Sequence, residues 1–543
     1  KWQQARGGKL ESSKVEVKPV KPLREMQVPR LAHNLSRVLF NPGVHWLREP
    51  RTGIYNFDPA LRHIADVDLF DYDSLPPYVT SSADPELAKI TKRESARYSG
   101  STSSLTGALS QIYFHLSHWR RPDFSGFSEG FAGQTRDFGA GARLPASIRL
   151  RKTSAEGEAP RYAVDQDKSA SGEAENSNYI LTQLGKALEN FFTKSPEEYA
   201  KHLRVNSHKL TPEERSRPEA YHYARARNLV MRSQLDCSDE RLPRRTFDLK
   251  TRAVAAVRQD RANWVEAGGY AIRQLDGAHE SFEREMYDLV RSAFLKYYFQ
   301  ARIGHMDGIF LAYHSTSSIF GFQYVPLEDM ARRLFGDTDM AEQAFRLSVA
   351  MLEEILDAAT DFFPDEPLKI TLDTSPGPRS LMDVFSASDA DAPAAEPSVS
   401  APRTIVQLQV LLDRYLDGQL VQGPVDFSAA AGRRVDARSD DEPSRRARAE
   451  LPPVQWDVEW AISPCASLSE ADIRENLAKV RARQSIFNEL SLPNIDSLNA
   501  RDEERLEELA SNPEALARFK AERAAGTAAG MPTAPGQTSE AKP

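Results

Sequence analysis

Residues 246–253 read TFDLKTRA, a run in which polar and apolar side chains alternate. Alternation is typical of a β-strand, because successive side chains of a strand point to opposite faces. One face is therefore predicted to carry Thr246, Asp248, Lys250 and Arg252, and the other face is largely apolar. A carboxylate and an ammonium group thus stand side by side next to an apolar interior.

A second strand-like run, RNLVMRSQLDC (227–237), precedes this one. Asp236 lies near its end, on the same face as Arg232 and Gln234. The short polar connection between the two runs contains Pro243, which favours a turn. An antiparallel hairpin through that turn brings the Asp236 carboxylate close to that of Asp248.

Two carboxylates in one small space repel each other unless a cation neutralises them. A hard divalent ion takes oxygen ligands and keeps several waters, so we expect Mg²⁺ or Mn²⁺ to be held by Asp236, Asp248 and the Leu249 carbonyl. Such an ion makes its water easier to ionise and stabilises charge on a phosphate. Lys250 is then expected to orient the attacking water and offset the developing charge. This is the chemistry of a phosphodiesterase.

The Asp/Glu-x-Lys string is short and therefore weak on its own. It occurs at 16–18, 248–250 and 540–542, and the first and last lie in predicted tails. Only the central string lies on a predicted core strand with an upstream aspartate. The alternative interpretation is a surface hairpin that carries an ordinary Lys–Asp pair.

The surrounding patterns predict an α/β fold with a mixed sheet flanked by helices. Helices are expected at 103–119, 178–192 and 281–300 and over much of 326–360, and strands at 147–152, 161–167, 308–315 and 319–325.

Composition divides the chain into parts. We expect an extended arm over 1–30, an elaborated core over 31–375, an Ala/Pro/Ser-rich flexible linker over 376–403, and C-terminal elements over 404–500 that pack on the core. Those elements comprise a helix at 404–416, a strand at 454–462 and a helix from 467 to about 490. A helical end and a disordered tail are expected over 501–543.

The 543-residue chain has a net charge of −8, which alone argues against a nucleic-acid partner. Residues 202–261, however, hold 14 Lys and Arg against 8 Asp and Glu, a local balance of +6. Two cysteines exclude a disulfide framework, and no apolar run is long enough for a membrane-spanning helix, although peripheral membrane contact stays open. Because Lys1 begins the chain, we expect an N-terminal segment, with any targeting peptide, to precede it.

The order of an upstream Asp236, the string Asp248-Leu249-Lys250, a helix and a further strand is similar to that of the PD-(D/E)XK (restriction-endonuclease-like) nuclease superfamily. The strings NPGVHWLREPRTGIYNFDP, YVTSS, GSTSSLTGALSQIYFHLSHWR, FDLKTRA and ARIGHMDGIFLAYHSTSSIFGFQY resemble a family of fungal mitochondrial proteins that process the 5′ ends of transcripts. This resemblance covers about 35–345 and, more faintly, 454–490. It implies a PD-(D/E)XK core with N- and C-terminal extensions specific to the family.

The resemblance implies a 5′-to-3′ exoribonuclease that trims and degrades mitochondrial precursor RNAs in the matrix, peripheral to the inner membrane. Implied partners are single-stranded RNA, the mitochondrial RNA polymerase and the mitochondrial RNA degradation machinery. Carried over by residue, Asp236 and Asp248 are metal ligands and Lys250 is catalytic. The superfamily often adds an acid on its first core helix, but the 103–119 helix offers only Gln111, and Glu189 on the next helix is the candidate substitute. Both are supporting candidates, and one metal is the simpler expectation.

Candidate RNA contacts are Arg252, which shares the catalytic face, Arg232 and Gln234. Further candidates for a phosphate track are Arg225, Arg227, Arg244, Arg245, Arg258 and Arg261, with Tyr221, Tyr223 and Trp264 for base stacking. For each arginine the alternative is an ordinary surface residue, and the spacing of His305, Asp307 and His314 fits no standard metal-ligand set.

Two rival functions remain open. One is a non-catalytic RNA-binding adaptor that couples the polymerase to RNA processing and degradation, and the other is a DNA nuclease. No motif in the sequence encodes a sugar preference.

Overall fold

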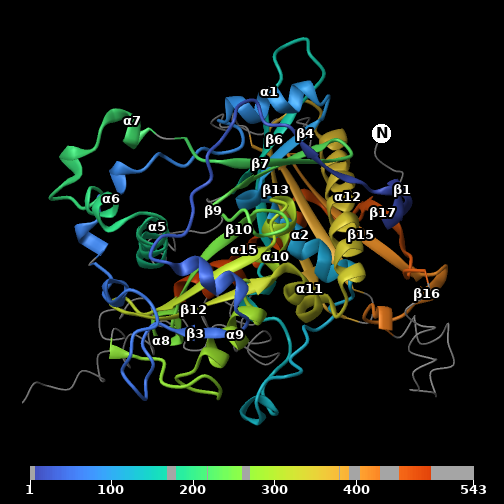
Figure 1. The fold of residues 1–543 in the computed structure, drawn as a ribbon. Helices are drawn as coiled ribbons and strands as arrows, with labels where there is room; N and C mark the ends of the chain where they lie inside the picture. The colour runs from blue at the N-terminus through green and yellow to red at the C-terminus, as the bar shows by residue number, and fades with distance from the viewer. Residues whose placement is uncertain are drawn as a thin grey trace, which may run out of the picture.

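The computed structural model describes residues 6–65, 67–167, 179–216, 218–259, 269–377, 380–389, 404–428 and 452–490. Within these residues the chain forms two β-sheets flanked by helices (Figure 1). The helices are α1 (Pro85–Arg93), α2 (Thr102–Leu116), α3 (Ala140–Arg143), α5 (Tyr179–Thr193), α6 (Pro196–Ala200), α7 (Pro212–Arg215), α8 (Ala255–Gln259), α9 (Phe282–Arg291), α10 (Phe294–Ile303), α11 (Leu327–Phe335), α12 (Thr338–Phe362) and α15 (Glu470–Leu490).

The larger sheet has twelve strands in the described part of the chain. In spatial order they are β1 (Arg6–Glu11), β17 (Trp456–Pro464), β15 (Ile405–Leu416), β14 (Leu381–Ser388), β13 (Leu368–Ser375), β5 (Ala146–Lys152), β6 (Tyr162–Gln166), β4 (Tyr98–Ser101), β8 (Leu229–Gln234), β7 (Tyr221–Ala226) and β2 (Val17–Val20), with β16 (Gln419–Val421) beside β15. Only β4 pairs with its neighbours in parallel, so the sheet is mixed.

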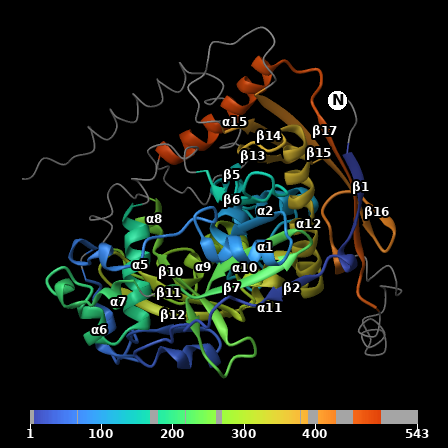
Figure 2. The same ribbon diagram turned by 90° about the horizontal axis from the view of Figure 1, so that it is seen from above.

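The two ends of this sheet come close together. The strands at its opposite ends, β1 and β2, follow each other in the chain, and the step from Glu11 to Val17 spans at most about 20 Å. The sheet therefore curls around α2 and α12, which Figure 2 shows from above. Gln343 of α12 stabilises this arrangement by contacting both the β1–β2 connection and β17. Its side chain accepts from Ser12 Oγ at 2.7 Å and from the Trp456 N–H at 2.8 Å.

The smaller sheet contains the strand that carries Asp248 and Lys250. Its strands, in order, are β3 (Val44–Trp46), β12 (Ile319–Pro326), β11 (Gly308–His314), β10 (Thr246–Ala253) and β9 (Cys237–Ser238). β10 and β11 run parallel, because the chain between them crosses over through α9 and α10, and the other pairs are antiparallel.

Helices cover both faces of the smaller sheet. Phe247 and Leu249 of β10 pack in one cluster with Leu188 of α5. Ile309, which lies beside Asp248 in the parallel register, belongs to the larger core that also contains α10. Asp248 and Lys250 therefore face α10, and α5 lies across the sheet from them. The predicted α/β fold, a mixed sheet flanked by helices, is confirmed.

Three predictions about single elements are wrong. Residues 381–388, predicted to lie in a flexible linker, form β14, where Met382 and Val384 are fully buried. Residues 405–416, predicted to be a helix, form β15, because the Val-Gln-Leu-Gln-Val alternation from 406 to 410 suits a strand with one buried face. The helix predicted over 281–300 is two helices, α9 and α10, with a break at Ser292.

The described parts of the predicted N-terminal arm and C-terminal elements belong to the larger sheet. The arm predicted over 1–30 contributes both strands at the ends of the larger sheet. The boundary predicted at 375 falls between β13 and β14, which pair along their whole length. Residues 501–543 lie outside the described residues, as do the other linker residues, 390–403.

The buried, neutral side chain of His115 makes the stability of the fold depend on pH. His115 is fully buried, its ring nitrogens lie 3.0 Å from Ser380 Oγ and 2.9 Å from the Val410 carbonyl oxygen, and burial lowers its pKa to about 3. Between that pKa and the ordinary value of 6.5 the unfolded chain binds more protons than the folded chain. The contribution of this histidine to the free energy of unfolding is therefore fully present above pH 6.5. As the pH drops below 6.5, that free energy falls by about 1.4 kcal/mol per pH unit for one such histidine.

We expect His115→Gln to weaken this dependence. The measurement is the melting temperature of the full chain and of the variant from pH 7.5 to 5.0, compared by slope rather than by absolute value. Parallel pH profiles for the two proteins would contradict the prediction.

Candidate active site

Asp248 and Lys250 form an ion pair on β10. Lys250 Nζ lies 2.8 Å from Asp248 Oδ2, with the carboxylate fully buried and the lysine side chain 18% exposed. Their two-residue spacing on a strand places both side chains on the α10 face, as the alternation predicts.

The hairpin brings Asp236 to the same place. β9 pairs with β10 through Cys237 and Phe247, so Asp236, one residue earlier, arrives opposite Asp248. Asp236 Oδ2 accepts the Leu249 N–H at 3.2 Å. The N–H and C=O of one strand residue point to the same edge, so the Leu249 carbonyl also faces the edge where Asp236 lies.

Two further carboxylates join this edge. Glu189 of α5 has its pKa raised to about 8 by burial and by the charge of Asp236, against the opposing effects of Lys250 and Lys186. Glu219, just before β7, has its pKa raised by burial and again by Asp236. We call Glu189, Glu219, Asp236 and Asp248 the acidic edge.

The charges of the acidic edge are strongly coupled. Burial raises the pKa of the Asp248 carboxyl well above its ordinary value, and Asp236 adds to this rise while Lys250 opposes it. Burial alone lowers the pKa of the Lys250 ammonium, but the charges of Asp248 and Asp236 outweigh burial and raise it. Lys250 is therefore a cation at neutral pH, suited to stabilising negative charge rather than to accepting a proton.

Helix α10 supplies two contacts that the sequence analysis missed. Gln300 Nε2 donates to Asp248 Oδ1 at 2.8 Å, and the Tyr297 ring lies 5.1 Å from Lys250 Nζ. The two residues are three apart and so share a helix face. Both residues lie within the helix predicted over 281–300, but the abundant aromatic residues of that segment obscured their role.

The acidic edge suits a divalent cation by its chemistry. Carboxylate and carbonyl oxygens are the ligands that Mg²⁺ and Mn²⁺ prefer. Burial, and then the charge of Asp236, raise the pKa of both Asp248 and Glu189, and a bound cation would oppose both effects. Within the part of the chain that the structure describes, no three His, Cys, Asp or Glu side chains already surround one point. A metal at this edge would therefore take Asp236 and Asp248 as its carboxylate ligands, with the Leu249 carbonyl and waters as the others.

The three residues predicted to contact RNA make hydrogen bonds or ion pairs within the protein. Arg232 is buried, pairs with Asp84, donates to the Val79 carbonyl at 2.7 Å and lies over the Tyr221 ring. Arg252 is buried with its Nε 3.8 Å from Glu285 Oε2. Gln234 donates to Glu219 at 2.6 Å, which places it beside the acidic edge as a support for a carboxylate.

Glu189 and Gln111, the two candidates for a supporting role at the site, lie in different parts of the structure. Glu189 lies at the acidic edge. Gln111 lies in the core of the larger sheet, where it donates to the Leu144 carbonyl at 2.7 Å and accepts the Thr374 N–H at 3.0 Å. Those bonds tie α2 to β13 and leave Gln111 a structural role.

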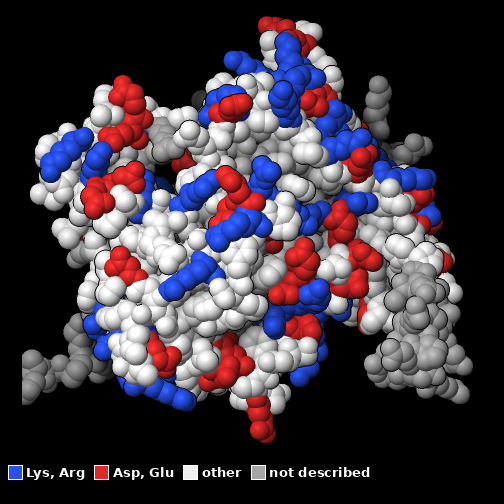
Figure 3. Space-filling view, in the orientation of Figure 1, with Lys and Arg blue, Asp and Glu red and all other residues white. Residues whose placement is uncertain are grey.

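Most arginines of the predicted phosphate track form ion pairs. The pairs are Arg225 with Glu94, Arg227 with Glu354, Arg244 with Glu328, and Arg258 with Glu285 and Asp288. Arg261 and Trp264 lie outside the described residues. Basic and acidic side chains alternate over the face in Figure 3, so no broad basic field marks an RNA path there.

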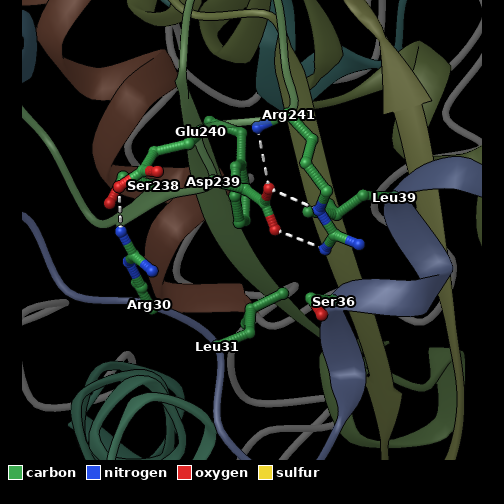
Figure 4. A pocket seen from close by; sticks show the side chains of 9 residues that line it. Arg30, Leu31, Ser36, Leu39, Ser238, Asp239, Glu240 and Arg241 are labelled. Carbon is green, nitrogen blue, oxygen red and sulfur yellow. Dashed lines mark hydrogen bonds and ion pairs between the residues drawn. The ribbon is translucent and has the colours of Figure 1, made fainter.

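A cavity of about 350 Å³ lies beyond β9, lined in part by Phe247, which is on the face of β10 opposite Asp248. Its charged groups satisfy one another, as Figure 4 shows: Arg241 makes two bonds to Asp239, at 2.8 and 2.6 Å, and Arg30 pairs with Glu240. This cavity is therefore separate from the acidic edge, and its charges are already balanced.

The sequence matches known proteins over much of its length. The family model described as "Mitochondrial protein Pet127" matches residues 78–357. A Schizosaccharomyces pombe protein named "mRNA degradation protein pet127, mitochondrial" is 38% identical over 353 residues, which are 64% of this chain and 66% of that protein. A Saccharomyces cerevisiae protein named "Putative mitochondrial translation system component PET127" is 39% identical over 323 residues, 56% of this chain and 37% of that protein. The chain thus covers less than two thirds of each relative.

Two solved structures of Scheffersomyces stipitis Rai1 are distant neighbours. One, in complex with (3′-NADP)+ and a calcium ion, has a TM-score of 0.30 at 9% identity, and the other has a TM-score of 0.32 at 10% identity. Each match covers 68% of this chain, and 88% and 89% of the Rai1 chains respectively.

Proposed function

Because the chain belongs to the Pet127 family of mitochondrial proteins, we propose that it is a metal-dependent 5′-to-3′ exoribonuclease that trims and degrades mitochondrial precursor RNAs. The observation that carries this proposal is the convergence of Asp236, Asp248 and Lys250 at one edge of the smaller sheet. The name of the S. pombe relative, an mRNA degradation protein, agrees with RNA as the substrate.

Each residue has a chemical role in the proposed reaction. Asp236, Asp248 and the Leu249 carbonyl would hold Mg²⁺ or Mn²⁺, which supplies an acidified water and charge stabilisation when bound. Lys250 donates to the scissile phosphate and offsets the charge that develops on it. Gln300 holds the Asp248 carboxylate in place, and Glu189 adds a further carboxylate beside Asp236.

The proposed cellular setting follows from the family resemblance. We propose that the protein works in the mitochondrial matrix, peripheral to the inner membrane, with the mitochondrial RNA polymerase and the RNA degradation machinery as partners. Among the described residues, no helix is both long and apolar enough to cross a bilayer.

Degradation of end-labelled substrates tests the proposed activity. Single-stranded RNA labelled at the 5′ end, the same RNA labelled at the 3′ end, and matched DNA are incubated with the full chain and Mg²⁺. We expect mononucleotide label to appear first from the 5′-labelled RNA and little release from DNA. RNA binding without release of any label would favour the non-catalytic adaptor, and equal release from DNA would favour the DNA nuclease.

A further inference from the structure

Lys296 is an exposed cation on α10, the helix that contacts Asp248 and Lys250. It lies on α10 one turn before Gln300 and next to Tyr297, the two residues that contact Asp248 and Lys250. Its side chain is exposed to solvent. In the described part of the chain it makes no hydrogen bond or ion pair.

Lys186 occupies a comparable place on α5. It lies three residues before Glu189, is exposed, and its charge lowers the pKa of both Glu189 and Glu219. Its ammonium too makes no hydrogen bond or ion pair among the residues that the structure describes, although its backbone carbonyl accepts from Asn190 Nδ2 at 2.9 Å. Its charge therefore acts on the acidic edge without being committed to one carboxylate.

The two lysines lie on opposite sides of the smaller sheet. Helix α10 covers the face that bears Asp248 and Lys250, and α5 covers the face that bears Phe247 and Leu249. The acidic edge lies where these two layers meet. Lys186 acts on this edge through its charge, and Lys296 lies on the helix that supplies Gln300 to Asp248.

An acidic edge poses a problem for a polyanionic substrate. The ionised carboxylates of the acidic edge repel phosphate groups, and Lys250 is already paired with Asp248. Additional cations beside the edge are needed to bring a nucleic-acid backbone close. Exposed lysines without partners meet that need at little cost, because binding a phosphate breaks no ion pair within the protein.

We propose that Lys296 and Lys186 bind backbone phosphates of single-stranded RNA on the two sides of the reaction centre. This inference rests on the proposed nuclease function and names the residues that position its substrate. Each lysine acts as a point charge on a phosphate, so it contributes to affinity without selecting a base. Arg232 and Arg252, the arginines that the sequence favoured, are already engaged within the fold.

Equilibrium binding without turnover tests the proposal. Affinity for fluorescent single-stranded RNA is measured by anisotropy in EDTA at several salt concentrations, for wild type, Lys296→Gln, Lys186→Gln and the control Lys89→Gln. Lys89 is an exposed lysine of α1, a helix that packs on β4 and β8 of the larger sheet, and it also lacks an ion pair among the described residues.

Loss of one phosphate contact lowers the slope of log affinity against log salt by about 0.7 for a single strand, which is roughly fivefold in affinity at 0.1 M salt. We expect this loss for Lys296→Gln and Lys186→Gln, with Lys89→Gln unchanged and Lys296→Arg restoring the slope. Unchanged slopes in both glutamine variants, or an equal loss in Lys89→Gln, would overturn the proposal.

The same proteins separate this inference from the proposed function. If wild type degrades RNA while both glutamine variants bind as wild type does, the inference fails alone. If wild type binds RNA but never degrades it, while the two variants lose the expected slope, the nuclease proposal fails and the phosphate contacts stand.

Discussion

Replacing Asp248 with Asn or Lys250 with Met is expected to slow RNA cleavage by roughly 10²–10³-fold or more. Asp248 is fully buried and holds both Lys250 and Gln300, so an amide in its place removes the charge at little change in size. Methionine keeps the apolar stem of Lys250 and removes the ammonium that offsets charge on the phosphate. The measurement is the single-turnover rate of RNA cleavage with enzyme in excess.

The matched control is Asp239→Asn. Asp239 belongs to the same hairpin, but its carboxylate is bound by Arg241 in the cavity beyond β9. We expect this variant to cleave at close to the wild-type rate. A Lys250→Met protein that melts like wild type and retains its full cleavage rate would contradict the assignment of Lys250.

The largest effect on stability is expected from Glu285→Ala. Glu285 of α9 is fully buried, accepts the Ala255 N–H at 2.7 Å and pairs with Arg258 at 2.7 Å, and Arg258 also reaches Asp288 at 3.0 Å. Removing one carboxylate from a buried ionic network leaves the charges of its arginines less well compensated and costs about 3–5 kcal/mol. The change in the free energy of unfolding is measured by chemical denaturation.

An exposed ion pair of the same segment provides the control. Glu280 pairs with Arg273 at 3.0 Å, and their side chains are 42% and 70% exposed. Surface pairs contribute little, so Glu280→Gln is expected to change the free energy of unfolding by less than about 1 kcal/mol. Equal losses in Glu280→Gln and Glu285→Ala would contradict the view that burial makes this network important.

Local pattern predicted the centre of the candidate site. Strand alternation placed Asp248 and Lys250 on one face, and the length of the hairpin brought Asp236 beside them. Glu189 was recognisable as an acid on a helix, but its contact with the site depends on α5 packing against β10, which local pattern does not encode. Gln111 was a candidate for the site by its sequence position, but it lies elsewhere in the fold. Its side chain on a buried helix accepts a hydrogen bond from the backbone of a distant strand.

The sequence could not show that the arginines predicted to contact RNA have partners within the fold. Sequence shows charge but not its partners, and the partners of Arg232 and Arg252, which are Asp84 and Glu285, lie far along the chain. Strands β14 and β15 were misjudged because polar or helix-favouring residues surround them, whereas their burial between β13 and β17 depends on long-range pairing. β1 and β2, the strands at the two ends of the larger sheet, depend on long-range pairing with β17 and β7 in the same way.

The central claim is that Asp236 and Asp248 hold a metal that the protein uses to cleave RNA. Its most direct test is release of nucleotide from 5′-labelled single-stranded RNA as Mg²⁺ is titrated into metal-free full chain, for wild type and Asp248→Asn. We predict saturable, EDTA-sensitive release by wild type, and release that is slower by roughly 10²-fold or more in the variant at every Mg²⁺ concentration. Equal release by both proteins, or wild-type release that persists in EDTA, would contradict the claim.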